Sequence, residues 1–298
     1  MQNNSVRQAG APRRLMAGVL GAAAMAATMA ISASATRADE LPGAYVELKN
    51  VRLWVSDSGG NGTPVIFLHA NTGTIENWRK QRAAFVAAGY RFIAFDRPGW
   101  GKSLVREGQK PIPVADDLEE LADQLKLDKF HIVAVAGGGY IAMDYAAWKP
   151  ERIRGLVIAA SGLGLGTDKE AVAFRENAAI PGFAKLPPEV REMSPTYRGF
   201  NPEEVKVWLE IEHNAKQKDA INPPQRSPNT REKVESIKPP VLVLAGDVDL
   251  TTPSGAVRLW ARYLKNYEFG LITEAGHSIA WEQPEQFNQR VMEFLKKY

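Results

Sequence analysis

Short apolar runs rich in β-branched and aromatic residues recur along the chain from residue 44 onwards. Runs of this length, bounded by glycine, proline or asparagine, are typical of β-strands, and a run without polar alternation indicates a strand covered on both faces. Eight strands are therefore predicted, the first two as a hairpin. They cover residues 45–48, 51–55, 65–68, 91–95, 130–135, 153–159, 241–244 and 268–272.

Longer stretches with helical character separate most of these strands. Alternation of strand and helix favours a mostly parallel sheet, because each crossover packs a helix against one face of the sheet. The sequence thus predicts an α/β fold, with a mostly parallel eight-stranded sheet and helices on both faces. The predicted helices cover residues 75–88, 114–125, 138–148, 255–263 and 284–297.

One long stretch interrupts this alternation. Residues 162–237 contain no strand-like apolar run and are broken repeatedly by proline, for example at Pro181, Pro202 and the pair Pro223-Pro224. A loop of this length without structure is rare inside a compact domain. We therefore predict a helical cap over residues 162–237, inserted into a core formed by residues 39–161 and 238–298.

The first 38 residues have the order of charge and hydrophobicity of a signal peptide. A basic start containing Arg13 and Arg14 precedes an uncharged, weakly apolar run over residues 15–31, and small residues follow up to Asp39. We expect a periplasmic or secreted protein. Export follows either the ordinary secretion route or the twin-arginine route, because the paired arginines resemble a twin-arginine signal. An uncleaved anchor is the alternative, although such small side chains bury little area in lipid. After cleavage no stable membrane anchor is expected.

Charge and cysteine content exclude several function classes. The formal charge of the 298 residues is +3, but four arginines and no acid precede residue 39, which leaves 33 basic and 34 acidic residues in the remainder. A nearly neutral body has no electrostatic footprint for nucleic acid. The absence of cysteine excludes catalysis by a thiol, and the four histidines do not have the spacing of metal ligands. We predict no metal, no cofactor, and a small molecule as substrate.

A histidine and an acid each follow one of the last predicted strands. His277 lies in a Gly-His-Ser loop between strand 268–272 and the helix that follows it. Asp249 is the last residue of a Gly-Asp-Val-Asp segment that comes directly after strand 241–244. An acid in such a loop can reach the histidine, select its tautomer and stabilise its charged form. The two residues are therefore candidates for a functional pair, whereas one histidine alone is more often a packed or solvated residue.

The segment Ala-Val-Ala-Gly-Gly at residues 134–138 has the small residues of a nucleophile elbow. Such an elbow is a tight turn from strand to helix, so its neighbours must be small. The helix that begins here also offers backbone N–H groups for an oxyanion, and the loop after strand 65–68 can supply another. The central residue of the segment, however, is Ala136.

These segments, in this order, resemble the α/β-hydrolase superfamily across nearly all of residues 44–298. The resemblance also rests on Phe-Asp-Arg-Pro-Gly-Trp-Gly-Lys-Ser at 95–103 and Phe-Leu-His-Ala at 67–70. It implies that Asp249 is the triad acid, that His277 is the base, and that the amides of Gly137 and either Ala70 or Asn71 are the oxyanion donors. Two positions depart from the family pattern: Ala70 replaces a glycine, and Ala136 replaces the serine, cysteine or aspartate nucleophile.

The alanine limits the chemistry that the site can perform. A methyl group cannot form an acyl-enzyme, and loss of the nucleophile costs a serine hydrolase roughly a millionfold in turnover. Ser161, Ser278 and Tyr140 carry hydroxyl groups nearby, but none stands at the elbow. Tyr140 and Trp281 flank the proposed site and are candidate substrate contacts. The aromatic residues of the cap can either line a pocket or form the cap's own core; they are Phe174, Phe183, Tyr197 and Trp208.

Four hypotheses for the function remain open. In the first, the protein is an enzyme for a small organic ester, lactone or carbonyl compound, and His277, oriented by Asp249, acts as a general base on water or on a substrate proton. Hydrolysis, a lyase reaction or cofactor-free oxygenation would follow. In the second, the protein binds a small molecule without turnover. In the third, it is a serine hydrolase whose elbow serine has been replaced by alanine. In the fourth, a displaced hydroxyl acts as the nucleophile. No oligomeric state is predicted.

Overall fold

Nine strands form one sheet in the computed structural model of the protein, which describes residues 40–298. The predicted signal peptide, residues 1–38, lies outside the described residues. The strands are β1 (Ala44–Glu47), β2 (Val51–Asp57), β3 (Thr63–Leu68), β4 (Tyr90–Phe95), β5 (Leu104–Val105), β6 (Phe130–Val135), β7 (Ile153–Ala159), β8 (Val241–Gly246) and β9 (Tyr267–Ile272).

The strand order confirms the predicted α/β fold. Strands pair in the order β1-β2-β4-β3-β6-β7-β8-β9, and all neighbours from β4 to β9 are parallel, while β1 and β2 pair antiparallel. All eight predicted strands are present. The ninth, β5, pairs with β2 over two residues, so the predicted number of strands was one too low. A two-residue pairing has no periodic pattern by which a sequence could predict it.

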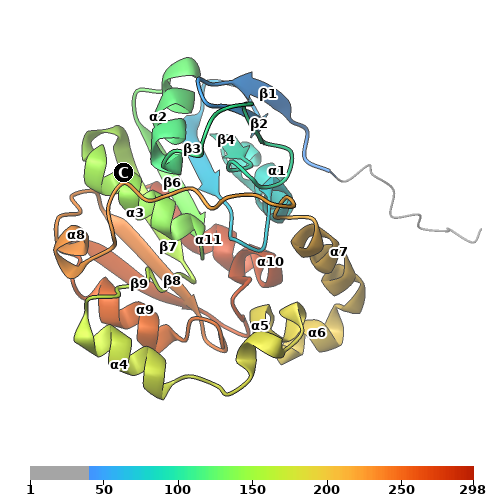
Figure 1. Ribbon diagram of the computed structural model, residues 1–298, viewed down its shortest axis with the longest axis vertical. Coiled ribbons are helices and arrows are strands. Elements are labelled where there is room, and N and C mark those ends of the chain that lie inside the picture. The colour runs from blue at the N-terminus through green and yellow to red at the C-terminus, as the bar shows by residue number, and fades with distance from the viewer. Residues whose placement is uncertain (1–39) are drawn as a thin grey trace, which may run out of the picture. The chain divides into compact units, whose positions relative to one another are not determined.

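Helices cover both faces of the sheet (Figure 1). No helix within residues 40–298 is long and apolar enough to cross a membrane. The helices are η2 (Ile75–Trp78), α1 (Arg79–Ala87), α2 (Val114–Gln124), α3 (Gly138–Trp148), η3 (Pro150–Arg152), α4 (Lys169–Asn177), η4 (Phe183–Lys185), α5 (Pro188–Glu192), α6 (Pro195–Phe200), α7 (Pro202–His213), α8 (Arg231–Glu235), α9 (Ser254–Ala261), α10 (Ile279–Glu282) and α11 (Pro284–Leu295).

Alternate residues of the central strands face two separate hydrophobic cores. Phe67 pairs in register with Val133, and both belong to the core that α1 and α11 cover. Their neighbours Ile66 and Ile132 also pair, and they belong to the core beneath α2, α3 and α9. Because successive strand residues point to opposite faces, continuous apolar runs are what a sheet covered on both sides requires.

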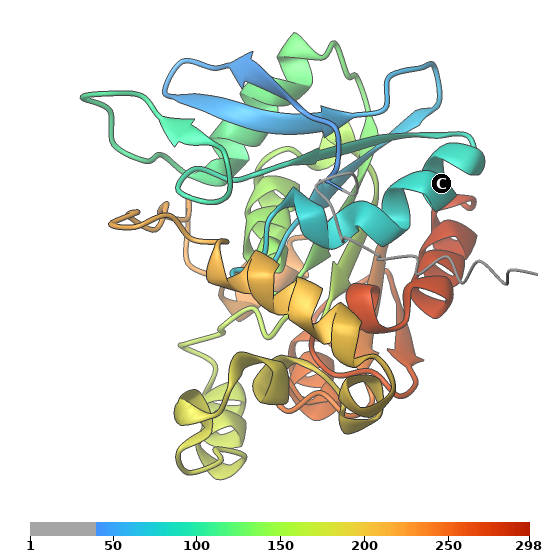
Figure 2. The ribbon, with the colours of Figure 1, turned by 90° about the vertical axis from the view of Figure 1, so that its right-hand side faces the viewer.

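The predicted helical insertion lies between β7 and β8 and contains α4 to α8 (Figures 1 and 2). Its helices form a third hydrophobic cluster, in which Trp208 and Tyr197 pack against Trp281 of α10. The insertion also contacts the loops that follow β8 and β9, since Thr251 donates to the carbonyl of Arg191 at 2.8 Å and the backbone N–H of Ser278 donates to that of Glu192 at 2.9 Å. The insertion therefore covers the edge of the sheet where the predicted site residues lie.

Asp117 in α2 is a buried carboxyl group without a hydrogen-bond partner among the described residues. Burial, and next the negative charge of Glu120, raise its pKa to about 8. A folded-state pKa above the unfolded value means that ionisation destabilises the fold, increasingly as pH rises from about 4 to 8. We expect Asp117→Asn to raise the unfolding free energy at pH 8 by about 1–2 kcal/mol, and to change it little at pH 4.

Thermal and urea unfolding at these two pH values would measure the effect. Asp123→Asn is the matched control, because Asp123 lies on the same helix, is ion-paired with Arg152 at 3.0 Å and should give no gain. Equal stability of Asp117→Asn and wild type at pH 8 would contradict the expectation.

Candidate active site

The turn between β6 and α3 is as tight as the sequence predicted. Ala136, at its tip, has a φ of 46°, in the left-handed region that a side-chain-bearing residue seldom adopts. The two glycines that open α3 pack against neighbouring backbone and side chain. A Cβ on Gly138 would lie 2.3 Å from the carbonyl oxygen of Leu68, and one on Gly139 would lie 2.6 Å from the Ser161 hydroxyl. Only glycine fits at positions 138 and 139. The turn therefore has the tight strand–turn–helix shape of a nucleophile elbow, with Ala136 at its tip.

The structure brings His277 and Asp249 together. Nδ1 of His277 lies 2.8 Å from Oδ2 of Asp249, and both side chains are buried. The other carboxylate oxygen accepts the backbone N–H groups of Thr251 and Thr252, each at 2.8 Å. Asp249 is therefore held in place by its own loop. Because Asp249 binds Nδ1 of His277, Nε2 is the imidazole nitrogen that is available for chemistry.

His277 is more basic than an ordinary histidine. Burial lowers its pKa, but the negative charges of Asp249 and Glu192 raise it more, to about 9. The imidazole is therefore mostly protonated at neutral pH and becomes an effective base as pH rises toward 9. No hydrogen bond joins His277 to Ser161, Ser278 or any other hydroxyl in the described part of the chain.

Glu192 is a site residue that the sequence did not reveal. It is the last residue of α5 in the insertion, it is buried, and it lines the same cavity as His277. Its Oε2 has no hydrogen-bond partner among residues 40–298, and burial raises its pKa. Ser278, next to His277, donates its backbone N–H to the carbonyl of Glu192 at 2.9 Å. This contact holds the carboxylate of the cap close to the imidazole.

Two backbone N–H groups lie close to Ala136 and have no acceptor among the described residues. They belong to Gly137 and Asn71. The N–H nitrogen of Asn71 lies 3.1 Å from the point that a Gly137 Cβ would occupy, so the two loops are in contact. Ala70, the other predicted donor, does not line the cavity, and its carbonyl faces His69 Nδ1 at 2.7 Å. The geometry therefore favours Asn71 over Ala70 as the partner of Gly137.

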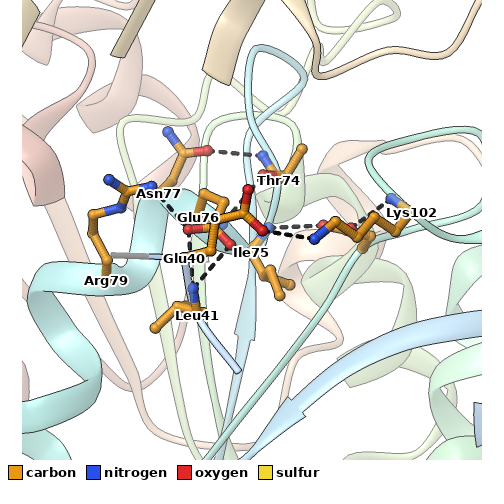
Figure 3. Close-up of polar contacts among 9 residues, drawn as sticks. Glu40, Leu41, Thr74, Ile75, Glu76, Asn77, Arg79 and Lys102 are labelled. Carbon is orange, nitrogen blue, oxygen red and sulfur yellow. Dashed lines mark hydrogen bonds and ion pairs between the residues drawn. The ribbon is translucent and has the colours of Figure 1, made fainter. Parts of the chain in front are cut away.

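A network of largely part-buried polar contacts holds the start of η2, where the loop after β3 ends (Figure 3). The carboxylate of Asp96 accepts the backbone N–H groups of Ile75 and Lys102, each at 2.8 Å. Glu76 accepts the N–H of Leu41 and an N–H of Arg79. Burial raises the pKa of Asp96 to about 6, although the hydrogen bonds from the N–H groups of Lys102 and Ile75 offset part of this effect. These contacts fix the loop from which Asn71 approaches the turn.

A cavity of about 940 Å³ lies beside the turn and is lined by both core and insertion. The cavity is lined by Ala136, Gly137 and His277. Tyr140, a candidate substrate contact from the sequence, also lines it. Trp281 does not line it. Its side chain is buried in the cluster between α10 and the insertion, so the interpretation of Trp281 as a substrate contact is corrected to a packing role.

The aromatic residues of the insertion divide between the two roles that the sequence left open. Phe174 and Phe183 line the cavity, whereas Tyr197 and Trp208 form the core of the insertion. No group of three or more metal-ligating side chains lies close enough to hold a metal ion within residues 40–298.

Comparison with known proteins agrees with this geometry. A family model described as "Alpha/beta hydrolase family" matches residues 65–290, which is most of the chain. The chain belongs to the alpha/beta hydrolase family. This hydrolase is 27% identical over 264 residues to a 2-hydroxy-6-oxononadienedioate/2-hydroxy-6-oxononatrienedioate hydrolase of Paraburkholderia phymatum, which covers 82% of this chain and 91% of the relative.

Two solved structures are also similar to this hydrolase. One is an N-acyl homoserine lactone degrading enzyme, with a TM-score of 0.69 and 29% identity over 84% of this chain and 100% of that one. The other is a thermophilic esterase of Thermogutta terrifontis with malate bound, with a TM-score of 0.68 and 25% identity over 85% of this chain and 98% of that one. These relatives are hydrolytic enzymes, and this chain is a hydrolase-type enzyme.

Proposed function

We propose that this hydrolase cleaves small esters or lactones by direct attack of water, with His277 as general base and no covalent intermediate. The observation that carries the proposal is that His277, bound through Nδ1 to the buried Asp249, lines the same cavity as Ala136. An oriented base and the tip of the turn therefore border one cavity, and the tip residue carries only a methyl group. Relatives named as a lactone-degrading enzyme and an esterase support the choice of substrate class.

The proposed reaction follows from the atoms that the structure brings together. Nε2 of His277 accepts a proton from water while the water oxygen bonds to the substrate carbonyl carbon. The N–H groups of Gly137 and Asn71 donate to the oxyanion that forms. The tetrahedral intermediate then collapses, and the imidazolium returns its proton to the departing alcohol oxygen. Asp249 keeps Nδ1 protonated throughout, so that Nε2 is the nitrogen that exchanges the proton.

Ala136 stands, in this proposal, at the position of the family's nucleophile. The left-handed backbone at residue 136 supports this assignment, as does the N–H group of Gly137, which has no acceptor among the described residues. Without a nucleophile, binding and oxyanion stabilisation alone give an expected acceleration of only about 10³-fold over the reaction in water, and the base adds to it.

The pH–rate profile tests the proposal. The base must be neutral, and the pKa of His277 is raised to about 9. The rate above background should therefore rise about tenfold for each pH unit from 6 to about 8, and level off near 9. Glu192→Gln removes a negative charge beside the imidazole, which lowers the pKa of His277. We therefore expect the plateau to move to lower pH and the rate at pH 7 to increase several-fold.

Initial rates on 4-nitrophenyl butyrate between pH 6 and 9.5, corrected for spontaneous hydrolysis, give this profile. Glu189→Gln on the same helix is the matched control and should reproduce the wild-type curve. A wild-type rate that does not depend on pH in this range, or a Glu192→Gln profile that coincides with wild type, would argue against His277 as the base.

A further inference from the structure

Arg97 is a buried cation beside the candidate site that has no carboxylate partner. It follows β4, its side chain lines the cavity, and only 6% of the residue is exposed. It forms no ion pair with any described residue, and its Nε has no hydrogen-bond partner among them. Burial lowers its pKa to about 9. Since a buried charge is costly unless it is paired, an unpaired guanidinium in a cavity indicates a missing anionic partner.

Three neutral groups hold Arg97 in place without neutralising its charge. Its backbone N–H donates to Nε2 of His69 at 3.1 Å, and burial keeps the pKa of that histidine near 3. Its Nη2 donates to Oδ1 of Asn71 at 2.5 Å, and its guanidinium carbon lies 3.9 Å from the centre of the Trp100 ring. The guanidinium is therefore positioned in advance for a ligand, as a binding group on a rigid support should be.

The other charges of the cavity do not balance Arg97. Two further cations line it, Arg175 and Lys216, and neither forms an ion pair with a described carboxylate. Of the two acids that line it, Asp144 is bound to Lys233 at 2.6 Å, and Glu192 faces the imidazole of His277. The cavity thus has an excess of positive charge, although residues 39–298 as a whole carry slightly more acidic than basic groups.

We propose that Arg97 binds a free carboxylate of the substrate, so that this hydrolase prefers esters or lactones of acids that carry a second carboxylate. A guanidinium matches a carboxylate with paired N–H donors, and such charged bonds are stronger than neutral ones. The preference among substrates rests on the proposed function, whereas the binding of a carboxylate by Arg97 does not. Asn71 Oδ1, which binds Arg97, lies 2.2 Å from the point that a Gly137 Cβ would occupy. The two carbonyl groups of the substrate acid are therefore separated by only a few carbons.

Binding of adipate, a six-carbon dicarboxylate, tests the site without any turnover. Titration calorimetry should show that wild type binds adipate more tightly than its neutral diamide, adipamide. Arg97→Gln should lower the affinity for adipate roughly ten- to hundredfold and leave that for adipamide unchanged. Arg258→Gln removes the same charge outside the cavity and should change neither. Equal wild-type affinities for adipate and adipamide would overturn the proposal, and this comparison stands even if Arg97→Gln does not fold. Equal losses of adipate affinity in the two variants would overturn it too.

Two matched esters test the preference in turnover. The 4-nitrophenyl monoester of adipic acid carries the free carboxylate, and 4-nitrophenyl 6-methylheptanoate replaces it with an uncharged group of similar shape. We expect wild type to favour the charged ester in kcat/KM, and Arg97→Gln to lower that preference at least tenfold. An unchanged preference would overturn the role of Arg97. Absence of turnover with both esters, together with tight adipate binding, would reject the proposed function and retain the carboxylate site.

Discussion

Replacing Ala136 by serine is expected to raise ester turnover by at least on the order of a hundredfold. The strained backbone of a nucleophile elbow is already present, with a φ of 46° at residue 136. The base and its acid are already 2.8 Å apart, and the N–H groups of Gly137 and Asn71, close to the turn, have no acceptor among residues 40–298. A hydroxyl at this position completes a nucleophile, base and acid, whose joint loss costs a serine hydrolase roughly a millionfold. The expected gain is smaller because the raised pKa of His277 leaves little neutral imidazole at pH 7.

Steady-state rates and a covalent label together check this result. Ala136→Ser should release 4-nitrophenol in a burst and gain the mass of a fluorophosphonate adduct on residue 136, while wild type gains none there. Ala136→Ser combined with His277→Ala is the matched control, and it should lose the gain. If Ala136→Ser stays at the wild-type rate and remains unlabelled, the turn does not hold the position of a nucleophile.

Asp249→Asn is expected to lower the wild-type turnover by about 10²- to 10³-fold. The carboxylate oxygen at 2.8 Å from Nδ1 keeps the proton on that nitrogen. An amide N–H₂ group in its place donates to Nδ1 and moves the imidazole proton to Nε2, which then cannot act as a base. The fold should tolerate the change, because the amide oxygen still accepts the N–H groups of Thr251 and Thr252.

Asp247→Asn is the matched control for this change. It removes a charge from the same loop at an exposed residue, whose Oδ1 accepts the N–H of Ala275 at 3.2 Å. Rates within about twofold of wild type are expected for it at pH 8. If Asp249→Asn also stays within twofold, Asp249 does not select the tautomer of His277.

The sheet and the His277–Asp249 pair could be predicted because their signals are local. Continuous apolar runs such as residues 130–135 indicate strands covered on both faces, and the small residues at 134–138 indicate a tight turn. Asp249 and His277 follow neighbouring parallel strands, whose carboxyl ends meet at one edge of the sheet. Once the parallel sheet is inferred, the proximity of the two side chains follows from topology.

The roles of Trp281, Glu192 and Arg97 could not be predicted in this way, because they depend on tertiary contacts. Trp281 is four residues from His277, yet a short helix turns it into the cluster with the insertion. Glu192 is one acid among several in a proline-rich stretch, and only the docking of α5 brings it to the imidazole. Arg97 belongs to a family motif at residues 95–103, and its missing partner becomes visible only when every neighbouring charge is placed.

The most direct test of the account compares wild type with His277→Ala on 4-nitrophenyl butyrate at pH 8.5. We expect turnover above background for wild type and a rate above background for the variant that is lower by at least about a hundredfold. A variant that keeps the wild-type rate would contradict His277 as the base. Wild type at background, with both proteins folded, would also contradict the account, and it would favour a protein that binds its small molecule without turnover.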